Sequence, residues 1–125
     1  MSMPRAAMVL LLAGGMLTWG RANAPAADAT METLTGEVVD LACYIPHPTT
    51  SHGNGHRKCA DTCLKKGMPM GLVTADKQVY LLLENHDNPK PYSQLKEKAA
   101  ETVTIEGTKA SEGGVQGFVV EALKE

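Results

Sequence analysis

The sequence predicts a small, mainly β domain: a five-stranded barrel with a Cys- and His-bearing helical insertion after its first strand. Segments that alternate apolar or β-branched residues with polar ones recur along the chain, as they do in half-buried strands. Glycine-containing and polar turns separate these segments. Helical spacing with matching end signals occurs in residues 56–66 and 91–100, so helix is predicted to be the minor component.

The first predicted strand covers residues 33–41, where threonine, valine and leucine are concentrated. Residues 42–55 contain two prolines and two glycines and are predicted to form a loop. The helix predicted over residues 56–66 has two lysines in its last turn and Gly67 directly after it, which is typical of a helix end. This loop and helix form the predicted insertion.

Residues 71–74 and 78–83 flank a short polar turn and predict a β-hairpin. After the second helix, at residues 91–100, the alternation within residues 102–106 indicates a fourth strand. A two-glycine turn then leads to a fifth strand at residues 117–123. Five short strands with a helix between the third and the fourth match an OB-fold-like barrel, and a different small mixed α/β sheet is the alternative.

The N-terminal residues 1–26 have the features of a secretory signal peptide. A positively charged start precedes an apolar run, and Ala22-Asn23-Ala24 and Ala24-Pro25-Ala26 both have the small-x-small form of a cleavage site. The apolar run is shorter than a spanning helix needs, so we expect a cleaved signal and a periplasmic or secreted protein rather than a membrane anchor. Residues 27–32 are predicted to be a disordered lead-in, and residues 33–125 a single domain.

The charge and composition of the mature chain argue against some classes of partner. Residues 1–26 contain two arginines and no acidic residue, so their removal changes the formal net charge from −2 to −4. A mildly acidic domain with few aromatic residues is poorly suited to binding nucleic acid. Motifs for serine or metal-dependent hydrolysis and for phosphate binding are absent from the sequence, so we do not predict an enzyme.

The residues with the most distinctive chemistry are Cys43, His56, Cys59 and Cys63, which include all three cysteines of the chain. Spacings of three and four residues place His56, Cys59 and Cys63 on one face of the predicted helix. Cys43 lies upstream, across a glycine- and histidine-rich loop that can fold back toward the helix. Three thiolates and an imidazole suit a closed zinc site or a soft copper(I) site.

Four further side chains are possible accessories to this site: Asp40, His52, Met68 and Met70. Asp40 could orient a ligand histidine from behind, or it could be a turn residue at the end of the strand. His52 could exchange into the site, although a loop histidine is more often simply solvated. Met68 and Met70 could supply thioethers to copper(I), or they could fill the core.

The odd number of cysteines favours metal binding over a disulfide but does not exclude the disulfide. In an oxidising compartment Cys43 could pair with Cys59 or Cys63 and leave one thiol free, or the thiols could be inert core residues. We predict an exported metal-binding protein with a structural or metal-handling role. The alternatives are a protein active in thiol–disulfide exchange and a non-catalytic binding module with a structural disulfide.

Four runs of the chain carry a resemblance to known proteins. They are TGEVVD at residues 35–40, CY at 43–44, HRKCADTC at 56–63 and GMPMG at 67–71. In these runs the chain resembles a group of small exported bacterial OB-fold-like proteins, and the similarity extends over nearly the whole mature chain. The resemblance implies the fold and export, and it names no reaction.

Overall fold

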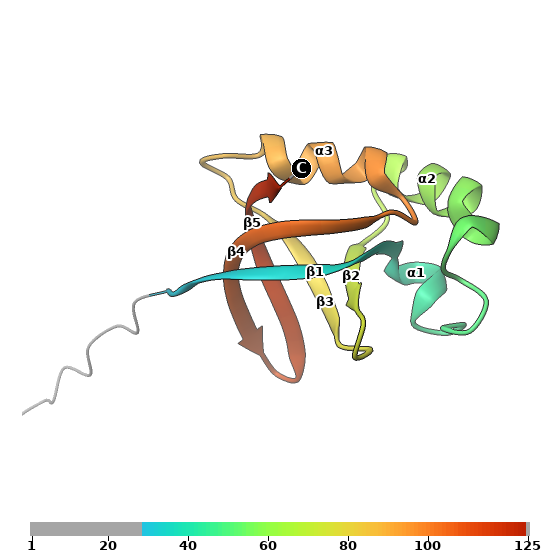
Figure 1. The fold of residues 1–125 in the computed structure, drawn as a ribbon, viewed down its shortest axis with the longest axis horizontal. Coiled ribbons are helices and arrows are strands. Elements are labelled where there is room, and N and C mark those ends of the chain that lie inside the picture. The colour runs from blue at the N-terminus through green and yellow to red at the C-terminus, as the bar shows by residue number, and fades with distance from the viewer. Residues whose placement is uncertain (1–28, 125) are drawn as a thin grey trace, which may run out of the picture.

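The structure is a computed structural model that describes residues 29–124. The predicted signal peptide, residues 1–26, therefore lies outside the described residues. Within residues 29–124, five strands close into a ring in the order β1-β2-β3-β5-β4 (Figure 1). The strands are β1 (Met31–Asp40), β2 (Met70–Thr74), β3 (Val79–Glu84), β4 (Thr102–Glu112) and β5 (Val115–Lys124). The helices are α1 (Leu41–Tyr44), α2 (Arg57–Lys65) and α3 (Lys90–Leu95), with 3-10 turns η1 (Asn54–His56) and η2 (Lys96–Lys98). The prediction of a mainly β domain is confirmed.

Strand β1 connects the two sides of the ring, because it pairs with two neighbours along its length. Its first part pairs with β4, where Leu34 lies opposite Ile105. Its second part pairs with β2, where Val38 lies opposite Leu72. All pairs in the ring are antiparallel except that of β3 with β5. Strand β1 therefore ends beside β2, and residues 41–69 form the insertion between these two strands.

A two-glycine turn joins β4 to β5, as predicted. Gly113 and Gly114 have φ angles of 55° and 83°, in the left-handed region that glycine adopts without steric cost. Further along this hairpin, the pairing shifts between Glu106 and Gly107. A Cβ at Gly107 would lie 1.9 Å from the Val119 carbonyl oxygen, so the close approach of the two strands requires glycine there.

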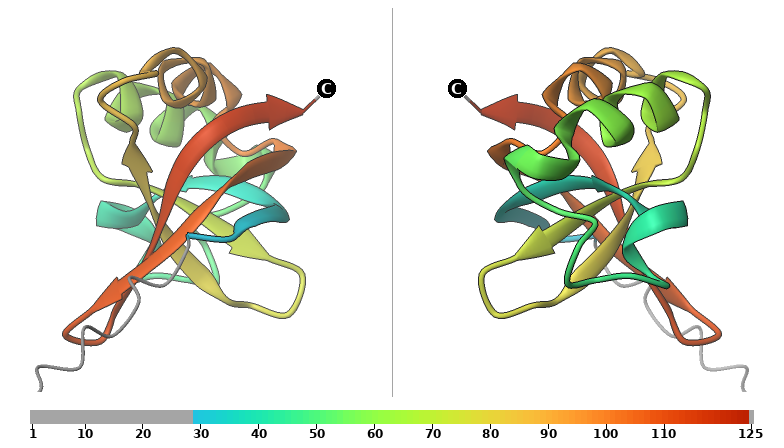
Figure 2. Two further views of the ribbon diagram at one scale, coloured as in Figure 1. Left: turned by 90° about the vertical axis from the view of Figure 1, so that its left-hand side faces the viewer. Right: turned by 90° about the vertical axis from the view of Figure 1, so that its right-hand side faces the viewer.

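The core fills the ring and continues beneath the helices at one end of it. Inside the ring, the inward-facing residues of the alternating strands are fully buried, among them Leu72, Ile105 and Phe118. Leu64 of α2 and Leu95 of α3 are also fully buried in the same cluster. Figure 2 shows α2 and the α3–η2 segment side by side over this end of the ring. The apolar face of α2 therefore fixes the helix on the ring.

The observed elements differ from the predicted ones at several boundaries. Strand β1 begins at Met31, so the last two residues of the predicted lead-in pair with β4, and Glu32 forms a 2.7 Å ion pair with Lys109. Residues 41–44 form helix α1 where a strand end and a loop were predicted. The second helix is shorter than predicted, because α3 ends at Leu95 and continues only as the η2 turn. Within residues 29–124, no helix is long and apolar enough to cross a membrane.

Candidate metal centre

Three thiols meet where the insertion folds against the end of β1. Cys43 comes from α1, and Cys59 and Cys63 come from successive turns of α2. The three sulfur atoms all lie within 4.8 Å of one another. All three cysteines fall within residues 29–124, and each is a free thiol in the structure. The predicted grouping of Cys43 with the two helix cysteines is confirmed.

The position of Cys43 depends on the last residue of β1. Asp40 caps α1, since its Oδ1 accepts a hydrogen bond of 2.9 Å from the backbone N–H of Cys43. The backbone N–H of Leu41 donates to the Pro69 carbonyl at 2.8 Å and holds the start of α1 against the end of the insertion. These two bonds turn the chain sharply after the strand. Cys43 is therefore directed toward α2 by Asp40 at the end of β1 and by Pro69 just before β2.

The positions of Cys59 and Cys63 depend on the packing and the end of α2. Ala60 and Leu64 are buried against the ring, so the neighbouring Cys59 and Cys63 lie at the border of the buried face. Gly67 has a φ of 88° and follows the last turn, where the N–H of Met68 donates to the Cys63 carbonyl at 3.0 Å. This closure confirms the predicted helix end. Cys59 is exposed and Cys63 is half-buried, so the thiol group opens to solvent on the Cys59 side.

His56 lies beside the thiols in a different arrangement from the predicted one. It belongs to the η1 turn and precedes α2, because the chain tightens into a 3-10 turn over residues 54–56 before the α-helix begins. Its Nε2 lies 3.2 Å from Oδ2 of Asp40, whose side chain is fully buried. Asp40, Cys43 and His56 form a second group of possible ligands within 4.8 Å of one another. The two groups share Cys43, and neither contains all four predicted ligands.

Asp40 thus has the position that the sequence suggested for it, behind the histidine. A carboxylate on one ring nitrogen fixes the orientation and tautomer of an imidazole whose other nitrogen faces a metal. The same carboxylate caps α1 through its other oxygen, so it ties His56 and Cys43 to one buried point. Both the histidine and the first thiol are therefore positioned by the end of β1.

Burial and nearby anionic groups raise the pKa of two of the thiols. Partial burial, followed by the charge of the nearby Asp40 carboxylate, raises the pKa of the Cys43 thiol to about 11. Burial and the same carboxylate also raise the pKa of Cys63, and Cys59 adds to the effect. These two thiols are protonated at neutral pH. A bound cation would reverse the balance, because it stabilises thiolates that otherwise repel one another.

The other three side chains predicted as accessories, His52, Met68 and Met70, belong to neither group of possible ligands. His52 is in neither group of possible ligands, and its Nδ1 lies 3.9 Å from Oε2 of Glu37. Met70 is 1% exposed and belongs to the apolar core, which is the alternative that the sequence allowed. Met68 is 42% exposed just beyond the end of α2.

Sequence reasoning missed Glu37, which anchors the loop of the insertion. Its carboxylate accepts a hydrogen bond from the backbone N–H of Gly53, and it lies beside His52. Both contacts cross from β1 to the turn that leads into His56. Glu37 sits in an alternating strand, where an acidic residue ordinarily marks the solvent face, so the local sequence contains no signal for this role.

The site offers soft thiol ligands that can become thiolates, and one of them is exposed to solvent. Three sulfur atoms can share one metal ion, and a pair formed by the buried Asp40 and the half-buried His56 lies next to one of them. Cys43, Cys59, Cys63 and His56 are therefore close enough together for a metal-binding role. Comparisons with known proteins found no match to a family model, to a curated protein or to a solved structure.

Proposed function

We propose that this protein binds one soft metal ion, zinc or copper(I), through Cys43, Cys59 and Cys63. The observation that carries this proposal is the mutual distance of at most 4.8 Å between three sulfur atoms that come from two separate helices. Thiolates prefer copper(I) and zinc to harder cations such as magnesium or calcium. A bound cation would also balance the negative charge of Asp40 and of the thiolates that form on binding.

His56 would distinguish the two metals. Zinc is normally four-coordinate, so a zinc ion on three thiolates would take His56 as its fourth protein ligand. The contact between His56 and Asp40 supports this role, because such a carboxylate orients and strengthens a histidine ligand. Copper(I) is well served by sulfur ligands alone, so it would depend little on His56.

The exposure of Cys59 supports a metal-handling role over a purely structural one. A sulfur atom at the surface can be reached by the ligands of a partner, and transfer of a metal between proteins requires such access. The core cluster is apolar and contains none of the thiols, so the fold has a source of stability other than the metal.

We also propose that the domain is an OB-fold-like member of the exported bacterial group that its motifs resemble. The strand order, the parallel pairing of β3 with β5 and the place of α3 between β3 and β4 support this assignment. The signal-like residues 1–26 support export to the periplasm or beyond the cell.

Thiol–disulfide exchange is the main competing function, since one of the three thiols is exposed. Reactive cysteines in such proteins have a lowered pKa, because the thiolate is the nucleophile. The pKa values of Cys43 and Cys63 are shifted in the opposite direction. This difference argues against Cys43 and Cys63 as nucleophiles in exchange chemistry.

Native mass spectrometry of protein purified from its natural compartment tests the proposal. We expect the reduced protein to retain one zinc or copper ion for each chain, and the Cys43→Ser, Cys59→Ser and Cys63→Ser variants to lose it. His86→Ala is the matched control, because His86 is an exposed loop histidine outside both ligand groups. A chain that has lost two hydrogens to a disulfide and takes up no metal after reduction would rule the proposal out.

A further inference from the structure

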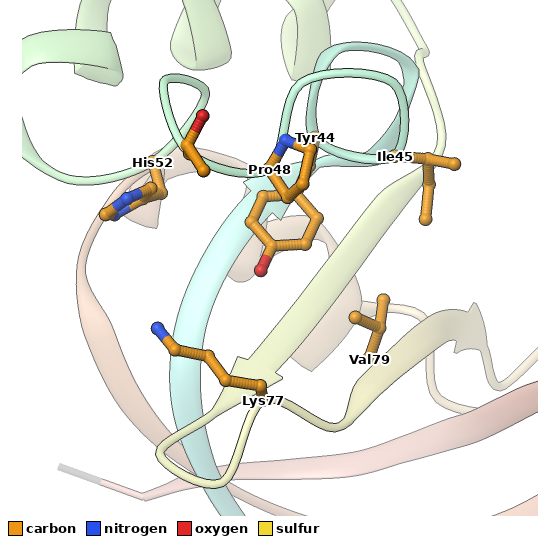
Figure 3. A pocket seen from close by; sticks show the side chains of 7 residues that line it. Tyr44, Ile45, Pro48, His52, Lys77 and Val79 are labelled. Carbon is orange, nitrogen blue, oxygen red and sulfur yellow. The ribbon is translucent and has the colours of Figure 1, made fainter.

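We propose that a pocket between the loop of the insertion and the β2–β3 hairpin binds a small amphipathic carboxylate. The pocket has a volume of about 560 Å³, within the roughly 300–1,000 Å³ that is usual for small-molecule sites. Figure 3 shows it between the loop that follows α1 and the turn that joins β2 to β3. It is separate from the thiol groups, because none of its lining residues is a member of either group.

One side of the pocket is apolar. Ile45 and Pro48 of the loop line it together with Val79 at the start of β3. Ile45 is 62% exposed, although its side chain is large and hydrophobic. Exposed aliphatic side chains around a concavity can be covered by the hydrocarbon or aromatic part of a ligand.

The Tyr44 side chain forms the inner wall of the pocket and presents a hydroxyl group without a partner. Tyr44 is only 7% exposed and its ring packs with Val39 and Val73. Its hydroxyl forms no hydrogen bond with any residue of the part that the structure describes. Every fully buried polar side-chain atom in that part has a partner, so a hydroxyl without one is not fully buried. The hydroxyl is therefore accessible from the pocket, as Figure 3 shows. A nearly buried tyrosine normally has a hydrogen-bond partner for its hydroxyl, and here a ligand can supply it.

Lys77 provides an unpaired positive charge on the same side of the pocket. Its amino group forms no ion pair with any residue between 29 and 124, and Figure 3 shows it on the His52 side of the pocket, with the Tyr44 hydroxyl facing the Lys77 side chain. Lys77 also has a φ of 65°, in a region where glycine is usual and a lysine is strained. The chain thus holds a lysine at a turn position that local geometry would assign to glycine.

His52 completes the polar side of the pocket and lies beside a carboxylate. Its ring lines the pocket, and its Nδ1 lies 3.9 Å from the carboxylate of Glu37. The neighbouring Asp76 carboxylate accepts a hydrogen bond from the hydroxyl of Thr74, and among residues 29–124 it forms no ion pair with Lys77. Lys77 is the one lysine or arginine among the residues that line this pocket.

These features together specify the chemistry of the ligand. The ammonium of Lys77 and the hydroxyl of Tyr44 offer two donors to a single carboxylate, and the apolar side receives a short aliphatic or aromatic body. A neutral analogue would lose the charge-assisted contact. An amine would be repelled by Lys77.

An NMR titration of the ¹⁵N-labelled protein with 4-phenylbutyrate tests the proposal, with 4-phenylbutan-1-ol as the neutral control. We expect amide shifts to concentrate at Tyr44, Ile45, His52, Lys77 and Val79, and the alcohol to bind about tenfold more weakly. Variants that lose the metal site, such as Cys59→Ser, should bind the carboxylate with unchanged affinity, so this test does not depend on the metal proposal.

Substitution of Lys77 makes the test specific. Lys77→Gly removes the ammonium and relieves the backbone, so the variant should fold at least as stably and bind 4-phenylbutyrate about tenfold more weakly. Lys77→Arg should keep most of the affinity. Lys66→Gln, at an exposed lysine after α2, is the control and should have no effect. The proposal would be overturned if the acid and the alcohol bound with equal affinity, or if Lys66→Gln lost as much affinity as Lys77→Gly. It would also be overturned by amide shifts spread over the whole domain, or by no binding at millimolar concentration.

Discussion

The ring of strands and the insertion bury different kinds of side chain. The large core cluster of the ring is composed of apolar residues, with Phe118 and Ile105 fully buried near its middle. Asp40 and Ser51 are the two polar side chains that are buried among residues 29–124, and they lie at the end of β1 and in the insertion. The ring is thus stabilised by burial of apolar surface, whereas the insertion combines the buried Ala60 and Leu64 of α2 with hydrogen bonds to buried polar groups.

This difference separates stability from function. Interactions that position the thiols can change without removing the core, and a metal can bind or leave without unfolding the ring. The two regions should therefore respond differently to substitution, to metal and to pH.

The largest effect should come from a core residue of the ring. Phe118→Ala should lower the free energy of unfolding by about 3–5 kcal/mol, because it removes a buried aromatic ring and leaves a cavity. Urea denaturation followed by circular dichroism measures this change. Val115→Ala, at a 54% exposed position of the same strand, is the control and should change stability by about 0.5 kcal/mol or less. Similar losses in the two variants would contradict the assignment of the core.

Metal should stabilise the protein through the insertion alone. At a free metal concentration about a hundredfold above the dissociation constant, the free energy of unfolding should rise by about 2.7 kcal/mol, because only the folded chain brings the three thiols together. Thermal melting with metal and with added chelator measures the difference. In Cys59→Ser the metal should have little effect, while the metal-free variant should melt near the metal-free parent, since Cys59 is exposed. A chelator that leaves the parent curve unchanged would contradict a metal bound to the folded state.

Asp40 lies between the two regions and should affect both. Asp40→Ala should cost about 2 kcal/mol, because it removes the cap of α1 and the partner of His56. Asp40→Asn should cost less, since asparagine also caps helices, but it should still weaken zinc binding. Urea denaturation and a competitive zinc titration measure the two effects. Asp61→Ala, which breaks a surface ion pair of α2 with Lys65, is the control and should have little effect on either measurement.

The last prediction concerns the pH dependence of metal affinity. Cys43 and Cys63 have raised pKa values, so they bind protons at neutral pH and must release them to the metal. Two released protons make the affinity rise about tenfold for each half unit of pH. The rise should continue from pH 6 to pH 9, because the pKa of Cys43 is about 11. Competition with a chelator of known proton affinity measures the slope, and a plateau near neutral pH would show that the thiols are already ionised.

The sequence predicted those features that depend on local patterns. The hairpin of β2 and β3 and the end of α2 at Gly67 follow from alternation and from a glycine stop signal, and both were confirmed. The three cysteines were predicted as one group because soft ligands at these spacings suit a metal. Their chemistry is visible without knowledge of the fold.

The features that the sequence did not predict depend on contacts between distant segments. Helix α1 has a local cap in Asp40, but its start is also held by the bond from Leu41 to Pro69, twenty-eight residues later in the chain. His56 leaves the helix face because the loop is held back on β1 through Gly53 and Glu37. Such contacts have no local signature, so they appear only when the ring and the insertion are assembled.

X-ray absorption spectroscopy of the metal-loaded protein tests the central claim most directly. Loaded with zinc or copper(I), the site should show three sulfur neighbours, at about 2.3 Å for zinc, with one additional light-atom ligand in the zinc form. The number of sulfur neighbours should fall in each cysteine-to-serine variant that still takes up metal. A first shell of only nitrogen and oxygen, or one with fewer than three sulfur atoms in the parent protein, would contradict the account.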